Sequence, residues 1–153
     1  MNEHKKILND FLVDTFNDIL RQEEIALAHL SNHTLSISEV HVLEAVFKSL
    51  ETGENTATTI ARILRITMGS LTVAIKTLEK KGYLFRERTE ADKRVVRITP
   101  TPLAVFVNQK HHEFHHEMID EIVKDMSIEE ERSLVEALQK VRIYFQTKSD
   151  QSK

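Results

Sequence analysis

The shortage of glycine and proline constrains the fold of this chain more than any other feature of its sequence. Only three glycines and two prolines occur among 153 residues. An all-β fold needs turn-forming residues every few positions, and these two are the strongest interrupters of regular structure. Long helices need such residues only at their ends. We therefore expect a mainly α-helical protein.

Composition disfavours several classes of protein. The chain has no cysteine, so it can form no disulfide, no thiolate zinc site and no thiol redox switch. Its apolar runs are only a few residues long, too short for a membrane-spanning helix, and the first ten residues lack the apolar stretch of a signal peptide. We expect a cytoplasmic globular protein with no membrane partner.

Apolar periodicity gives the order of elements. Apolar residues recur at three- and four-residue intervals from Leu8 to Leu30, which predicts a long first helix. Ser36 or Ser38 caps a second helix, which stops near Gly53. Two short helices follow within 56–80, and a fifth and a sixth occupy about 102–126 and 128–145. Residues 83–88 and 94–99 are rich in β-forming residues around a polar turn and predict a hairpin.

Charge is distributed unevenly along the chain. Residues 1–55 carry a net charge of −6, residues 56–98 of +6 and residues 99–153 of −3. A basic middle between acidic ends is typical of a protein whose central segment meets a polyanion.

The helix predicted at 67–80 has a surface suited to the major groove of DNA. Leu71, Ala74, Ile75 and Leu78 share its inner face, and Thr67 caps its start. Its outer face is small, hydroxylated and basic, which permits close approach and contacts with phosphates and base edges. The predicted DNA-binding residues of this helix are Thr67, Gly69, Ser70, Thr72, Val73 and Lys76.

The hairpin that follows is also basic. An exposed basic hairpin beside such a helix is typical of a wing that touches the DNA backbone or the minor groove. The DNA-binding residues predicted there are Arg86, Arg88, Lys93 and Arg94.

These elements predict a winged helix-turn-helix lobe at residues 36–99. A lobe this small cannot cover the apolar faces of the terminal helices. We therefore predict that residues 1–35 and 100–147 form a dimerisation domain in a homodimer, and that residues 148–153 are a flexible tail.

The wing carries a family resemblance. Asp92-Lys93-Arg94-Val95-Val96-Arg97-Ile98-Thr99 resembles the D-x-R…(L/I)-T signature of the MarR (multiple-antibiotic-resistance) repressors, and the element order matches along the chain. The resemblance implies that Arg94 enters the minor groove, that Asp92 braces the wing and that the operator is a pseudo-palindrome in double-stranded DNA. Pro102 departs from the pattern, because the family usually has glycine there.

Short stretches across the chain are similar to the fatty-acid-biosynthesis repressors of Gram-positive bacteria within this family. The resemblance implies repression of fatty-acid-synthesis genes with acyl-carrier protein as co-repressor, and an acyl chain held between the dimerisation helices and the DNA-binding lobe. Phe11, Phe16, Phe106 and Phe114 are the candidate pocket residues, although core packing is the more usual role for such residues. The similar stretches include Phe16-Asn17-Asp18-Ile19-Leu20, Ile37-Ser38-Glu39-Val40-His41, Met68-Gly69-Ser70-Leu71-Thr72 and Phe114-His115-His116-Glu117-Met118.

The histidine-rich segment 111–116 leaves alternatives open. Residues 112–116 match the H-E-x-x-H motif of zinc peptidases, but no third ligand or substrate cleft accompanies them, so we expect no enzyme. A zinc-sensing branch of the MarR family binds its ion with residues similar to Glu24, His41, His111 and His115. The alternative is a solvated face with one or two buried, hydrogen-bonded imidazoles. No cofactor is required, and zinc is the candidate ion.

Overall fold

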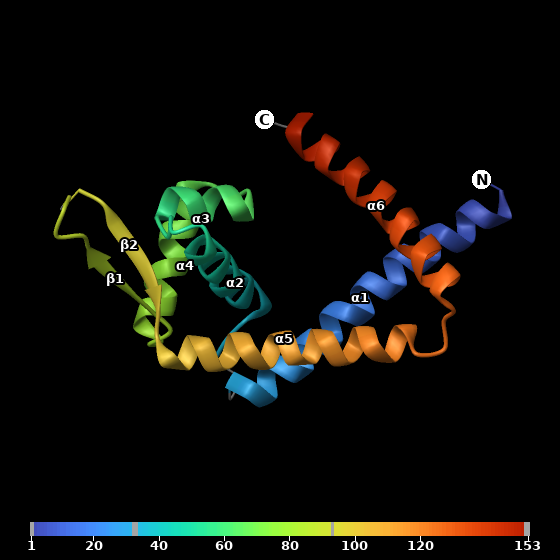
Figure 1. Ribbon diagram of the computed structural model, residues 1–153, viewed down its shortest axis with the longest axis horizontal. Helices are drawn as coiled ribbons and strands as arrows, with labels where there is room; N and C mark the ends of the chain where they lie inside the picture. The colour runs from blue at the N-terminus through green and yellow to red at the C-terminus, as the bar shows by residue number, and fades with distance from the viewer. Residues whose placement is uncertain (1, 32–33, 93, 152–153) are drawn as a thin grey trace. The chain divides into compact units, whose positions relative to one another are not determined.

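The computed structural model describes residues 2–31, 34–92 and 94–151 (Figure 1). Within these ranges it has six helices and one antiparallel β-hairpin, in the order predicted from the sequence. The winged helix-turn-helix fold is thereby confirmed. The elements are α1 (Glu3–Ser31), α2 (Ile37–Glu51), α3 (Ala57–Leu64), α4 (Met68–Lys80), β1 (Leu84–Arg88), β2 (Val96–Pro100), α5 (Pro102–Val123) and α6 (Ile128–Gln151).

The chain divides into two compact units, residues 1–114 and 115–153. The first holds α1, the predicted DNA-binding lobe and the first half of α5. Its core comes from all of these elements, so α1 and α5 are packed into the same unit as the lobe. Fully buried side chains of this core include Leu43, Val46, Ile60, Leu71, Ile75, Leu78, Ile98 and Val107.

Side-chain caps explain where the helices begin. Ser36 and Glu39 form a reciprocal capping box at the start of α2, so Ser36 is the cap rather than Ser38. Thr67 accepts a hydrogen bond from the Ser70 backbone N–H and starts α4 where the sequence predicted. Ser127 and Glu130 exchange the same pair of bonds before α6.

The wing is anchored to the loop before α3. Strands β1 and β2 pair from Leu84 with Pro100 to Arg88 with Val96. Thr56 adds an isolated bridge to Arg97 on the outer edge of β2. The Asn55 side-chain amide donates to the Ile98 carbonyl at 2.9 Å, and the Arg97 guanidinium donates to Asn55 Oδ1 at 2.7 Å and to the Gly53 carbonyl at 2.8 Å. The hairpin therefore has a fixed base, and its tip projects from the lobe (Figure 1).

The second unit contains the end of α5 and all of α6. Helix α6 continues to Gln151, so residues 148–151 are helical, and the flexibility of residues 148–153 stays a prediction. Hydroxyl groups of Thr147 and Ser149 donate to carbonyls one turn earlier, at 2.9 and 3.0 Å, and the polar sequence thus remains compatible with a helix. Residues 152 and 153 lie outside the described ranges.

No single helix of the described chain is long and apolar enough to cross a membrane. Helices α3 and α4 pass that test of length and composition only as a pair, and they are bent by 109° relative to each other.

The turn between α3 and α4 holds a residue in an unfavourable backbone conformation. Arg65 has φ 56° and ψ 39°, the left-handed region, and is the one non-glycine residue with positive φ in the described part of the chain. Its N–H and that of Ile66 bond carbonyls of the last turn of α3. These bonds hold the turn despite the steric cost of the Cβ atom.

We expect Arg65→Gly to raise the free energy of unfolding by up to about 1 kcal/mol, because glycine adopts the left-handed conformation without that cost. Urea denaturation followed by circular dichroism measures the change. The matched control is Gly82→Ala at φ 81°, which should destabilise the protein. A loss of stability in Arg65→Gly would contradict this account of the turn.

Candidate nucleic-acid interface

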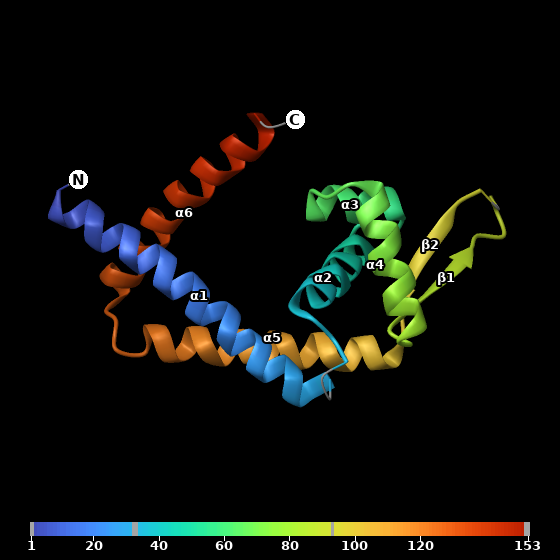
Figure 2. The same cartoon turned by 180° about the vertical axis from the view of Figure 1, so that it is seen from behind.

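Helix α4 has a buried face and a solvent-exposed face. Leu71, Ile75 and Leu78 are at most 2% exposed and fix its inner side against the core. At about 100° per residue, the opposite side carries the residues that the sequence predicts for DNA contact. Of these, Thr67, Gly69, Ser70, Thr72, Val73 and Lys76 are all exposed. Figure 2 shows α4 from behind, lying beside β1.

The first turn of α4 has free space around its backbone. A Cβ atom added to Gly69 would meet no other atom within 4 Å, and its φ is not positive. Neither packing nor backbone conformation therefore requires glycine at this position. The exposed hydroxyl groups of Thr67 and Ser70 bond each other at 2.9 Å beside it.

The last turns of α4 are basic. Lys76, Thr77, Lys80 and Lys81 line a surface depression of about 490 Å³. Lys81 donates to both carboxylate oxygens of Glu39 at 2.7 and 2.8 Å. Burial acts to raise the pKa of Glu39, but the hydrogen bonds from Lys81 and Ser36 outweigh it and lower that pKa. This pair ties the end of α4 to the start of α2 and leaves Lys76 and Lys80 exposed at the surface.

Hydrogen bonds within its own turn hold the tip of the wing. The Asp92 carboxylate accepts the Arg94 backbone N–H at 2.9 Å, while the Thr89 hydroxyl donates to the Asp92 carbonyl at 2.6 Å and accepts the Asp92 N–H at 3.2 Å. Arg94 on this braced turn is exposed, as is Arg88 at the end of β1. Lys93, also predicted to bind DNA, lies outside the described residues.

Arg86 has a contact that the sequence did not predict. Its Nε lies 3.0 Å from Glu79 Oε1, and the arginine side chain is 39% exposed. This ion pair joins β1 to α4. Arg86 thus positions the wing relative to the helix in the structure of the free chain.

A buried histidine joins α1, α2 and α5. His111 Nδ1 lies 2.9 Å from Glu44 Oε1, and His111 Nε2 lies 3.5 Å from Glu23 Oε1. The hydrogen bond with Glu44 raises the pKa of His111, although burial acts in the opposite direction. The same bond lowers the pKa of Glu44.

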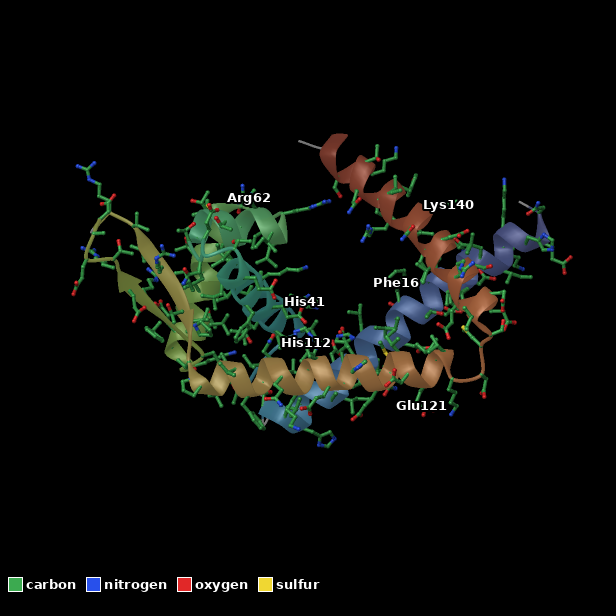
Figure 3. All side chains as sticks on the ribbon, in the orientation of Figure 1. Phe16, His41, Arg62, His112, Glu121 and Lys140 are labelled. Carbon is green, nitrogen blue, oxygen red and sulfur yellow. The ribbon has the colours of Figure 1, made fainter. Side chains whose placement is uncertain are left out.

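The four predicted zinc ligands differ in burial. Glu23, not Glu24, contacts His111, because Glu23 lies on the buried face of α1 with Leu27 while Glu24 is exposed. His41 is also exposed, and it lines a pocket of about 450 Å³ with His112 and Glu44. Figure 3 shows His41 on α2 and His112 on α5. His115 is half-buried one turn after His111.

The four candidate pocket phenylalanines have different environments. Phe11, Phe16 and Phe106 are 56%, 57% and 49% exposed in the single chain, so none of the three belongs to its core. Phe114 is half-buried. The pocket of about 450 Å³ is instead lined on its apolar side by Ala45, Phe47, Ile63 and Leu64.

Sequence reasoning missed Glu23, Glu44, Glu79 and Thr89. Glu23 and Glu44 contact His111, which is far along the chain, and Glu79 contacts Arg86 on the next element, so no pattern within one helix marks them. The role of Thr89 could have been predicted, since a threonine three residues before an aspartate in a tight turn commonly forms side-chain to backbone hydrogen bonds.

The comparisons with known proteins agree with this geometry. A family model described as "Transcriptional regulator SarA/Rot" matches residues 26–118. The chain is 30% identical over 112 residues to transcriptional regulator AdcR of Streptococcus pneumoniae serotype 2 (strain D39), with 72% of this chain and 74% of AdcR covered.

Solved structures match almost the whole chain. FabT of Streptococcus pneumoniae in complex with DNA has a TM-score of 0.84 at 28% identity, covering 94% of this chain and 98% of FabT. A MarR family protein from Bacillus stearothermophilus has a TM-score of 0.68 at 19% identity, covering 95% and 99%, which shows the fold alone. The chain therefore belongs to the SarA/Rot family of DNA-binding transcriptional regulators and is a winged helix-turn-helix protein of the MarR type.

Proposed function

We propose that this regulator is a homodimeric repressor of fatty-acid-biosynthesis genes and that acyl-carrier protein acts as its co-repressor. The observation that carries the proposal is the likeness to FabT in complex with DNA, which extends over 94% of this chain. DNA contact is assigned to the exposed face of α4 and to the wing arginines Arg88 and Arg94.

Exposed apolar side chains support a homodimer. Large apolar residues of α1 and α6 are about half exposed in the single chain, and monomeric proteins rarely leave so many of them in water. Two copies that bury these faces would present two α4 helices to half-sites about 34–36 Å apart in a pseudo-palindromic operator. The exposed residues include Ile7, Phe11, Phe16 and Leu20 of α1, and Val135, Leu138, Ile143 and Phe145 of α6.

The co-repressor would act on the spacing of the two α4 helices. A ligand shifts such an equilibrium only by its difference in affinity for the two states. The pocket lined by Ala45, Phe47, Ile63 and Leu64 lies between α3, α2 and the first half of α5, and its volume of about 450 Å³ is in the range of ligand pockets. We assign the acyl chain to this region, together with the exposed phenylalanines of the dimerisation helices.

Zinc sensing is the second candidate, and the contacts of His111 favour it. Metal-binding histidines commonly donate their second ring N–H to a carboxylate, which orients the imidazole. His111 has that arrangement, with Nδ1 on Glu44 and Nε2 directed to Glu23. A zinc ion would be held by His111 Nε2 and Glu23, with Glu44 as the orienting carboxylate.

Arg94→Ala should weaken operator binding and reduce its salt dependence. Losing one phosphate-region contact should lower the slope of log affinity against log salt by about 1. Fluorescence anisotropy at several salt concentrations measures this slope. Lys124→Ala in the second unit is the control, because that lysine is paired with Glu121 outside the proposed interface. An unchanged slope in Arg94→Ala would show that this arginine does not contact the DNA.

Gly69→Glu should abolish DNA binding while leaving the free energy of unfolding nearly unchanged. The protein itself has room for the side chain, and a carboxylate in the first turn of a helix is favourable. Against a phosphate-lined groove the same carboxylate is repelled. A gel-shift assay and urea denaturation measure the two effects, with Gly69→Ala as the smaller matched change. Normal operator affinity in Gly69→Glu would show that the first turn of α4 does not face the DNA.

The two effector classes can be separated in one gel-shift assay. We expect long-chain acyl-carrier protein to strengthen the operator shift and EDTA to leave it unchanged. The unacylated carrier protein is the control. A shift that EDTA abolishes and zinc restores, with no response to the acylated protein, would instead establish metal sensing.

A further inference from the structure

Val73 is an apolar side chain at the centre of the DNA-facing side of α4. It is 66% exposed, while the inner side of the helix is already filled by Leu71, Ile75 and Leu78. Packing within the chain therefore gives no reason for valine at this position. Lys76, three residues later, shares the exposed face.

Two hydroxyl groups close to Val73 donate hydrogen bonds within the helix. Thr72 Oγ1 donates to the Met68 carbonyl at 2.8 Å, and Thr77 Oγ1 donates to the Val73 carbonyl at 3.0 Å. These threonines keep lone pairs that can accept hydrogen bonds, but their donor hydrogens are used. Val73 itself thus offers an apolar side chain, while the hydrogen-bond donors of this face come from Lys76 and from the Ser70 hydroxyl, which accepts a bond from Thr67 and keeps its own hydrogen.

Gly69 lies one turn before Val73 on the same face. Neither its backbone nor its surroundings require glycine, since an added Cβ would meet nothing within 4 Å. The absence of a side chain allows the start of α4 to approach a base pair closely. Close approach matters here because valine is short.

Only one group on the base edges of the major groove is apolar, the C5-methyl group of thymine. We propose that Val73 reads this methyl group, so that each operator half-site has a thymine at the base pair facing Val73. This inference rests on the proposed function, because it assumes that α4 enters the major groove. The thymine methyl is the only feature of the groove edge that a hydrocarbon side chain can recognise favourably.

The test uses a duplex selected by the full-length protein from a randomised library. Each thymine of the selected half-site is replaced in turn by deoxyuridine, which removes the methyl group and keeps base pairing. Replacement at one position should weaken binding about fourfold, the equivalent of one apolar carbon returned to water, and replacement in both half-sites more than tenfold. Fluorescence anisotropy at constant salt measures the affinities.

Val73→Ala should lose affinity for the thymine duplex and should no longer distinguish thymine from deoxyuridine at that position. Its thermal unfolding reports whether the fold is intact, which we expect because the side chain is exposed. Lys76→Ala is the matched control on the same face: it should weaken binding to both duplexes equally and keep the deoxyuridine penalty. The combination of these three results supports the proposal.

Two results would contradict this proposal, and they have different consequences for the proposed function. If deoxyuridine is tolerated at every position, or its penalty persists in Val73→Ala, the reading by Val73 is wrong while DNA binding stands. If the selection enriches no sequence at all, sequence-specific DNA binding fails, and the proposed function fails with it.

Discussion

The burial of one face of α4 is the constraint on which the interface depends. Leu71, Ile75 and Leu78 are at most 2% exposed, and full burial of each such side chain stabilises a fold by about 1.5–3 kcal/mol. Rotating α4 to present a different surface would remove these contacts. The exposed face of the helix is therefore the one that bears Gly69, Val73 and Lys76, the face to which we assign DNA contact. The packing of the buried face of α4 thus determines which side chains its exposed face presents.

The wing is held to the lobe by contacts of two kinds. At its base, Asn55 and Arg97 connect the loop before α3 to β2 through hydrogen bonds of 2.7–2.9 Å. Along its length, the Arg86–Glu79 ion pair connects β1 to α4. Because this pair is partly exposed, it contributes little to stability, and its main effect is on orientation. The wing and α4 thus form one surface rather than two independent arms.

The buried side chain of His111 links three helices of the first unit. The side chain is 4% exposed and contacts carboxylates from both α1 and α2. Removing one partner of such a buried group leaves the other unsatisfied at a cost of about 1–3 kcal/mol. The contacts of this one side chain therefore hold α2 to both α1 and α5.

The sequence alone determined the features that depend on neighbours along the chain. Helical periodicity separated the two faces of α4, a capping residue marked its start, and the basic hairpin contained Arg88 and Arg94. Only the tertiary structure decided which carboxylate meets His111, since Glu23 and Glu24 are adjacent and the choice depends on how α1 packs. The same is true of Glu79 with Arg86 and of Asn55 with Ile98. A periodic pattern specifies which face of a helix is buried, but the partner of that face is set by contacts between segments far apart in the chain.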